Sequence, residues 1–221
     1  IDEDKYFQQS GNMINQQVRT WEVLDERVLD TLREVPREEF VPVRHRKLAF
    51  SDLRIPLGHG QLMMKPVEQG RMLQSLSLQP GDRVLEVGTG TGFITACLSH
   101  LGGRVTSIEI LDSLAEQAGA NLDMQDIDEV DLRVGDALSA EFERDSYDAV
   151  VVSASIASIP ERFIELLRPG GRLFAVRGMS PAMEAVLLTR TAAGRTREES
   201  LFDTDLPRLI GAEDAPVFSF D

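Results

Sequence analysis

The chain has 221 residues, of which 42% are hydrophobic and 27% charged, and its formal net charge is −14. This length and composition suit one α/β domain with a full hydrophobic core. The acidic charge repels phosphate backbones, so we expect no nucleic-acid partner. A single cysteine, Cys97, excludes an intrachain disulfide and a cysteine-based zinc cluster, and we expect no metal site.

The chain carries no sign of export or membrane insertion. Its first residues are acidic, which does not suit a signal peptide, and no apolar run approaches the roughly 20 residues of a membrane helix. We therefore expect a cytoplasmic protein with no membrane partner. The sequence leaves open whether the protein is a monomer or a homodimer, and what residues 1–12 do.

Two helices are expected at the N-terminus. Residues 13–24 have apolar side chains at three- and four-residue spacing, which predicts an amphipathic helix with Trp21 in the core. A second helix opens at Asp25 and ends at Pro36. Residues 36–66 are rich in proline and glycine, which predicts a long loop of the kind that serves as a functional lid.

Strands and helices then alternate along the rest of the chain. This alternation predicts an α/β fold with a doubly wound, mostly parallel sheet. We divide the single domain into residues 1–80, which contain the N-terminal helices and the lid loop, and a core over residues 81–221. The expected helices are 66–76, 93–100, 111–124 and 159–168; the expected strands are 84–87, 104–110, 130–134, 147–154, 172–176 and 185–191, with edge strands near 201–202 and 217–220.

The most informative stretch is VLEVGTGTGF, residues 84–93. An apolar strand leads through Glu86 into a turn, and a helix follows; open α/β sheets bind nucleotide-like ligands at such a point. Three glycines occupy alternate positions of the turn: Gly88, Gly90 and Gly92. A dinucleotide site would need a further glycine at position 93, where Phe93 stands, so a pyrophosphate ligand is not predicted.

A second acidic residue supports a nucleoside ligand. Glu109 closes the next expected strand and follows Gly88 by 21 residues (109 minus 88). A Rossmann-like sheet places its ribose-binding carboxylate roughly 20 residues after the first glycine. With this carboxylate, the spacing E-x-G-x-G-x-G resembles motif I of class I S-adenosylmethionine-dependent methyltransferases.

Four segments resemble one family, the protein-L-isoaspartate O-methyltransferases. Residues 33–42 are similar to its VPRExFVP signature, residues 49–61 to its AYxD…PIGxGQ loop, residues 84–93 to VLEIGTGSGY, and residues 167–173 to LKPGGRL. The similarity runs from about residue 13 to about residue 191. It implies a seven-stranded Rossmann-like methyltransferase sheet with an N-terminal helical extension, S-adenosyl-L-methionine as cofactor, and methylation of the carboxylate of isoaspartyl residues in damaged proteins.

The resemblance also implies roles for individual residues at the cofactor site. The glycine turn would lie under the methionine part of the cofactor and Glu86 would order that turn. Glu109 would hold the ribose hydroxyls, and Asp136 with the Ala137 backbone would meet the adenine amino edge. The full implied set is Glu86, Gly88, Thr89, Gly90, Gly92, Glu109, Ile110, Asp136 and Ala137.

The expected lid loop holds the candidate catalytic residues His59, Gln61 and Met64. Here the sequence departs from the family, because Leu62 and Met64 occupy its Thr and Ser positions. A hydroxyl that could hydrogen-bond a substrate is thereby replaced by a thioether, which is at best a weak acceptor. A carboxylate acceptor would be ionised at neutral pH and would need no general base, which fits a pocket with few ionisable groups.

Three functions remain open from the sequence. The first is methylation of an isoaspartyl protein or peptide. The second keeps the cofactor but transfers the methyl group to a small molecule or another residue, because Leu62 and Met64 have removed polar substrate contacts. The third is an S-adenosylmethionine-binding module without turnover.

Overall fold

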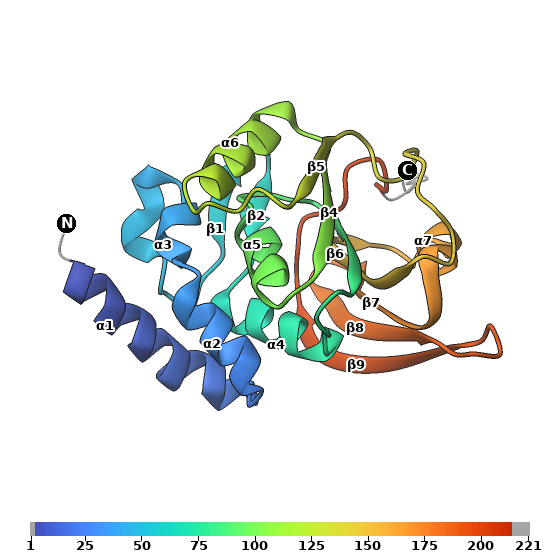
Figure 1. The fold of residues 1–221 in the computed structure, drawn as a ribbon, viewed down its shortest axis with the longest axis horizontal. Coiled ribbons are helices and arrows are strands. Elements are labelled where there is room, and N and C mark those ends of the chain that lie inside the picture. Colours follow the sequence, from blue (N-terminus) through green and yellow to red (C-terminus); the bar gives the residue numbers. More distant parts are fainter. Residues whose placement is uncertain (1–2, 214–221) are drawn as a thin grey trace, which may run out of the picture.

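A seven-stranded sheet in the order β5-β4-β3-β6-β7-β8-β9 forms the centre of the molecule (Figure 1). The computed structural model describes residues 3–213, so the edge strand expected near 217–220 lies outside the described residues. From β5 to β7 neighbouring strands are parallel, whereas β8 is antiparallel to both neighbours, which confirms a mostly parallel α/β sheet. The strands are β3 Arg83–Val87, β4 Arg104–Glu109, β5 Asp131–Val134, β6 Tyr147–Ile156, β7 Leu167–Met179, β8 Ala182–Arg190 and β9 Thr196–Thr204.

Helices cover both faces of the sheet. One face packs against a hydrophobic cluster that draws on α2 (Glu26–Glu34), α4 (Pro66–Leu76) and α5 (Phe93–His100). A second cluster joins the opposite face to α7 (Glu161–Leu166). Helix α6 (Asp112–Asp123) packs against β4 and β5. The first cluster contains residues from both sides of position 80, so the N-terminal helices and the sheet share one core.

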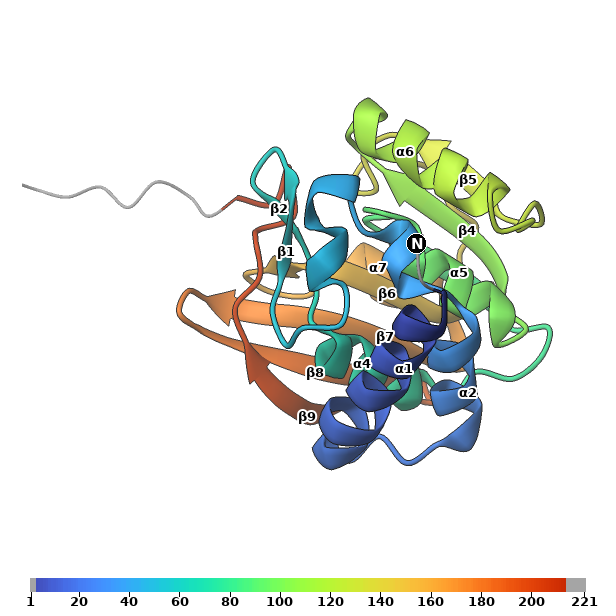
Figure 2. The same cartoon turned by 90° about the vertical axis from the view of Figure 1, so that its left-hand side faces the viewer.

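The N-terminal segment forms one long helical arm rather than the shorter helix expected. It begins as α1 (Glu3–Met13), continues as π-helix over Ile14–Val18 and ends as 3₁₀-helix over Arg19–Trp21. In Figure 2, α1 lies in front of the rest of the molecule. The expectation that Trp21 lies in the core is wrong, because its side chain is 45% exposed. The change in winding rotates successive side chains away from an α-helical period, so Ile14 and Val18 are buried while Trp21 faces outward.

The segment expected as a loop contains short regular elements. Helix α3 (Arg37–Phe40) and a 3₁₀ segment (Val43–Leu48) precede a two-stranded hairpin of β1 (Ile55–Gly58) and β2 (Gln61–Met63). Its turn has positive φ at Gly58, His59 and Gly60, a backbone conformation that glycine adopts at little cost. The hairpin leads directly into α4, whose first residue is Pro66 as expected.

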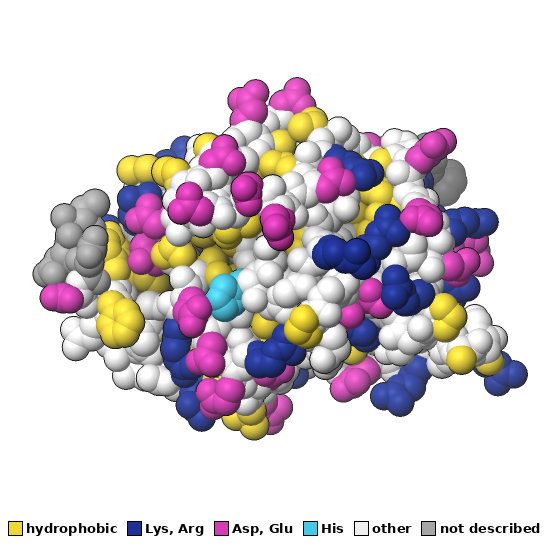
Figure 3. All heavy atoms as spheres, viewed as in Figure 1, with side chains coloured by type: hydrophobic (Ala, Val, Ile, Leu, Met, Phe, Trp, Pro, Cys, Tyr) yellow, Lys and Arg dark blue, Asp and Glu magenta, His cyan; other side chains and the backbone are white. Residues whose placement is uncertain are grey.

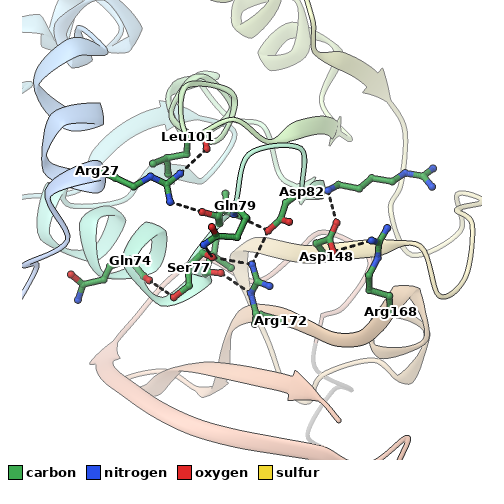
Figure 4. Close-up of polar contacts among 12 residues, drawn as sticks. Arg27, Gln74, Ser77, Gln79, Asp82, Leu101, Asp148, Arg168 and Arg172 are labelled. Carbon is green, nitrogen blue, oxygen red and sulfur yellow. Dashed lines mark hydrogen bonds and ion pairs between the residues drawn. The ribbon is translucent and has the colours of Figure 1, made fainter. Parts of the chain in front are cut away.

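Charged side chains join the strands at the amino ends of β3, β6 and β7 (Figure 4). Arg172 Nε donates to the Leu76 carbonyl at 2.6 Å and Arg172 Nη2 contacts Asp82 at 3.0 Å. Asp148 accepts from the Arg83 amide at 2.7 Å and pairs with Arg168 at 3.2 Å. These contacts fasten one end of the sheet, and a ligand site is therefore expected at the opposite, carboxyl ends of the strands.

The surface reflects the acidic composition. Figure 3 shows acidic and basic side chains interspersed over the face seen in Figure 1, with acidic ones gathered over α6 at the top of the view. Asp112, Glu116 and Asp123 belong to this helix. Among residues 3–213, no helix has both the length and the apolar character needed to cross a membrane.

Candidate active site

A cleft of about 830 Å³, part of it open to solvent, lies at the carboxyl ends of β3, β4, β5 and β6. Strand β3 pairs in parallel with β4 on one side and β6 on the other. Successive strands are therefore added on one side of β3 up to β5 and on its other side from β6 onward, so the strand order reverses at β3. The lining residues are Leu57, Gln61–Met64, Gln69, Glu86–Thr91, Phe93, Ile94, Ile108–Ile110, Leu114, Gly135–Ala137, Ser153, Ala154, Leu209 and Ile210. The cleft therefore lies at the edge of the sheet where the sequence predicted a ligand site.

The glycine turn after β3 forms the floor of this cleft. Gly88 and Gly90 have φ of +90° and +57°, which exposes their backbone to a ligand without a Cβ in between. The Glu109 carboxylate ties the turn to β4: one oxygen accepts from the Gly90 amide at 2.9 Å and the other from the Leu111 amide at 3.1 Å. Glu109 is buried and lines the cleft, as does the neighbouring Ile110.

Gly92 stands apart from the other two glycines. It does not line the cleft but begins α5 with φ +84°. A Cβ at this position would lie 3.3 Å from the Ala118 carbonyl oxygen and 3.4 Å from Leu122 Cγ on α6. The geometry therefore gives Gly92 a packing role between two helices, where the sequence placed it among cofactor contacts.

Glu86 lies fully buried beneath the glycine turn. Its Oε2 accepts from the Thr95 hydroxyl at 2.5 Å and the Ser107 hydroxyl at 2.8 Å, and Ser107 lies 2.6 Å from the Thr89 hydroxyl. Its Oε1 is buried without a partner among the described residues. Burial raises the pKa of Glu86 from 4.5 to about 7, although the two hydroxyls oppose this shift. The group is therefore a poorly compensated carboxylate beside the cleft.

Asp136 supplies a third carboxylate, after β5. Its Oδ1 accepts from the Leu138 amide at 2.8 Å and its Oδ2 from the Ser139 hydroxyl at 3.3 Å. Both Asp136 and Ala137 line the cleft. The three acids expected at the cofactor site, on three successive strands, thus lie around one cavity.

The hairpin and the residues after it form the opposite wall. Gln61 and Met64 line the cleft and Met64 is buried, whereas His59 does not reach it. His59 occupies the hairpin turn, where its Nε2 lies 3.3 Å from the exposed Ser113 hydroxyl. The structure therefore brings together two of the three residues expected to act in catalysis.

Two polar residues near this wall were missed from the sequence. Arg37 is buried, and it donates from Nε to the Ala49 carbonyl at 2.7 Å and from Nη2 to the Met64 carbonyl at 2.9 Å. Its Nη1 donates to Gln69 Oε1, and its guanidinium lies 5.1 Å from the centre of the Phe93 ring. Burial lowers the pKa of Arg37 to about 9, so it remains cationic at neutral pH. No sequence pattern marks a charged residue as buried, because the sequence alone does not show which carbonyls surround it.

A doubly wound sheet with a glycine turn and three carboxylates at its switch point defines the Rossmann-like methyltransferase class. The model of the family "Protein-L-isoaspartate(D-aspartate) O-methyltransferase (PCMT)" matches residues 8–201. The chain belongs to this family, as the resemblance of its motifs indicated.

Sequence relatives support the assignment over nearly the whole chain. A protein-L-isoaspartate O-methyltransferase 1 of Rhodopseudomonas palustris strain HaA2 is 38% identical over 213 residues, which cover 96% of this chain and 87% of the relative. A protein-L-isoaspartate O-methyltransferase of Aeropyrum pernix is 36% identical over 214 residues, covering 95% and 82%. The family expected from the sequence is therefore confirmed.

A solved structure supports the fold. A Plasmodium falciparum protein described as a protein-L-isoaspartate O-methyltransferase, in complex with S-adenosyl-L-homocysteine, superposes with a TM-score of 0.75 at 20% identity. The superposition covers 92% of this chain and 97% of the other. At this identity the likeness concerns the fold alone, and it confirms the Rossmann-like architecture.

Proposed function

We propose that the protein is an S-adenosylmethionine-dependent O-methyltransferase that methylates the carboxylate of isoaspartyl residues in proteins or peptides. One observation carries the cofactor part: the described residues that line the cleft include three carboxylates and no lysine, arginine or histidine. Such a lining repels a pyrophosphate and attracts the positively charged sulfonium and ammonium groups of S-adenosylmethionine. The family assignment supports the acceptor.

The residues present fit this cofactor. Glu86 Oε1 is a buried acceptor without a partner, which suits an ammonium donor, and the glycine turn lets a ligand lie against the backbone. Glu109 ends β4 and Asp136 follows the neighbouring strand β5, as the ribose and adenine positions require. We propose Glu86, Gly88, Thr89, Gly90, Glu109, Ile110, Asp136 and Ala137 as the cofactor-binding residues, with Gly92 supporting the turn from behind.

The bound cofactor supplies an activated methyl group. The residues of the chain then have to hold an acceptor oxygen in line with it, and such positioning alone supplies a large part of the rate enhancement in bimolecular reactions. An isoaspartyl carboxylate is already ionised at neutral pH, so it requires no general base. This agrees with a cleft to which His59 contributes no side chain and whose acceptor wall is formed by Gln61, Leu62 and Met64.

A second acceptor, such as a small molecule, is suggested only by the apolar side chains of Leu62 and Met64. The comparisons favour the isoaspartyl acceptor over this alternative and over a module without turnover, since the family match covers most of the chain. Cytoplasmic location and an assembly no larger than a homodimer belong to the same proposal.

Incubation with tritiated S-adenosylmethionine tests the function. We expect base-labile label on an isoaspartyl peptide and none on the matched aspartyl peptide. Label on a metabolite extract but not on the isoaspartyl peptide would support the small-molecule alternative. Calorimetric binding of S-adenosylhomocysteine without transfer to any acceptor would support the non-catalytic module.

A further inference from the structure

A carboxylate that accepts the methyl group needs a hydrogen-bond donor beside it. The hairpin side of the cleft provides none at positions 62 and 64. The side chains of Leu62 and Met64 carry no N–H or O–H group, and His59 lies outside the cleft. A carboxylate that leaves water without a donor to receive it loses much binding free energy. Gln61 of the hairpin also lines the cleft, but its Nε2 lies 3.5 Å from the His59 carbonyl in an exposed contact, so a buried donor has to come from another element.

Gln69 is placed to provide it. This residue of α4 is 3% exposed and lines the cleft. Its Oε1 accepts from Arg37 Nη1. Because arginine carries only donors, the atom that faces it must be the oxygen, and this fixes which way the carboxamide is turned. Among residues 3–213, this contact is the only hydrogen bond that the Gln69 side chain makes.

The Arg37 side chain is itself held in one position. Its other nitrogen atoms donate to the carbonyls of Ala49 and Met64, and its guanidinium lies over the Phe93 ring. Gln69 is therefore held in one orientation before any acceptor arrives, which reduces the conformational entropy lost on binding. A cationic donor on Oε1 also polarises the carboxamide, which strengthens its N–H groups as donors.

We propose that Gln69 is an acceptor-binding residue whose side-chain NH₂ donates a hydrogen bond to an oxygen of the methyl-accepting carboxylate. The proposal rests on the proposed function and assigns the anion-recognising group of the same cleft. Arg37 acts through Gln69 by turning its oxygen away from the acceptor. Selectivity for a carboxylate thus arises from a neutral donor in a cleft that is otherwise acidic.

The variant Gln69→Glu tests this assignment with the fold preserved. A carboxylate at position 69 still accepts from Arg37, but it has no N–H group and repels an anionic acceptor. We expect kcat/KM for the isoaspartyl peptide to fall at least about 10-fold, mainly through KM, because a hydrogen bond to a charged group is lost. The affinity for S-adenosylhomocysteine and the thermal midpoint should stay close to those of the wild type.

Gln74→Glu is the matched control, since it makes the same change on the same helix outside the cleft. Gln74 Oε1 accepts from the Leu24 amide at 2.8 Å, a contact that glutamate retains. We expect its kcat/KM to equal the wild-type value within twofold. Equal kcat/KM for Gln69→Glu and Gln74→Glu would overturn the assignment.

Peptide binding to the S-adenosylhomocysteine complex separates this proposal from the proposed function. If the wild type binds the isoaspartyl peptide without methylating it, the function fails, yet at least 10-fold weaker binding by Gln69→Glu still supports the donor role. Equal binding by both proteins overturns the donor role even where the wild type methylates the peptide. No binding by the wild type overturns both.

Discussion

Arg37 donates a hydrogen bond to the backbone carbonyl of Met64 at 2.9 Å, across 27 positions of the chain. The contact joins α3 to the segment between the hairpin and α4, which is part of the proposed acceptor wall. Arg37 has no carboxylate partner among the described residues, so carbonyl and amide oxygens and the Phe93 ring compensate its charge. Stability and acceptor geometry therefore depend on the same buried guanidinium.

Arg37→Lys should lower the free energy of unfolding by about 2–4 kcal/mol, because an ammonium cannot reproduce the planar, three-way contact and leaves buried carbonyls unpaired. Urea denaturation measures the change. Arg133→Lys serves as the control: Arg133 pairs with Asp131 at an exposed position, and its replacement should change stability by no more than about 0.5 kcal/mol. Equal effects of the two variants would contradict the role given to Arg37.

Glu109→Ala should weaken S-adenosylhomocysteine binding by about 30-fold or more. The variant removes the carboxylate proposed to hold the ribose and frees the Gly90 and Leu111 amides that it now orders. Isothermal titration calorimetry gives the affinity. Glu116→Ala, on the exposed face of α6, is the control and should bind as the wild type does. An unchanged affinity in Glu109→Ala would rule out its proposed role.

Glu86 should make stability depend on pH. Burial raises its folded-state pKa from 4.5 to about 7, so the folded protein holds this proton more tightly than the unfolded chain does. The resulting stabilisation is fully present below the unfolded pKa and is lost as pH rises through about 7. Relative to Glu86→Gln, which has no such proton, the wild type should lose about 1 kcal/mol between pH 6 and pH 8. Urea titrations at both pH values measure this difference, and a pH-independent difference would contradict it.

Gly88→Ala and Gly92→Ala should fail in different ways. Both positions have positive φ, so each alanine should cost about 1–2 kcal/mol of backbone strain. At Gly92 the new methyl also crowds Ala118 and Leu122, so this variant should show the lower thermal midpoint. At Gly88 the methyl meets only Ser153 at 3.8 Å and occupies ligand space, so this variant should show the larger loss of S-adenosylhomocysteine affinity. The opposite ranking in either measurement would refute this division of roles.

Met64→Ser should raise kcat/KM for the isoaspartyl peptide several-fold, because it adds a hydroxyl donor to the acceptor wall. The same change should lower the free energy of unfolding by about 2–4 kcal/mol, since the Met64 side chain is buried. Initial rates at saturating cofactor and urea denaturation measure the two effects. A stability loss without any gain in kcat/KM would show that a hydroxyl at this position does not assist the acceptor.

Sequence patterns predicted most of the sheet because buried parallel strands are continuous apolar runs. The run that ends at Ser153 and Ala154 became β6, and Asp25 began α2, where its side chain caps the Arg27 amide as its residue type favours. The fate of Trp21 was not predictable in this way. Its spacing fits an α-helix, but the helix changes its winding before reaching that residue.

The side of the cleft proposed to bind the cofactor could be outlined from the sequence because its residues follow single strands in order. Glu86, Glu109 and Asp136 come from consecutive strand ends, and parallel strands bring such ends together. The opposite side of the cleft depends on contacts between residues far apart in the sequence. Arg37 and Gln69 are 32 residues apart, and no sequence pattern predicts that their side chains meet. Gly92 matched the motif by spacing, yet only its neighbours on α6 show that it faces away from the cleft.

The walls of the cleft come from residues as distant along the chain as Leu57 and Ile210. A nascent chain that has not yet added the segment after β9 therefore has only an incomplete pocket, whatever local structure it has gained. The free energy of ligand binding can therefore stabilise the chain in full only once that segment is in place.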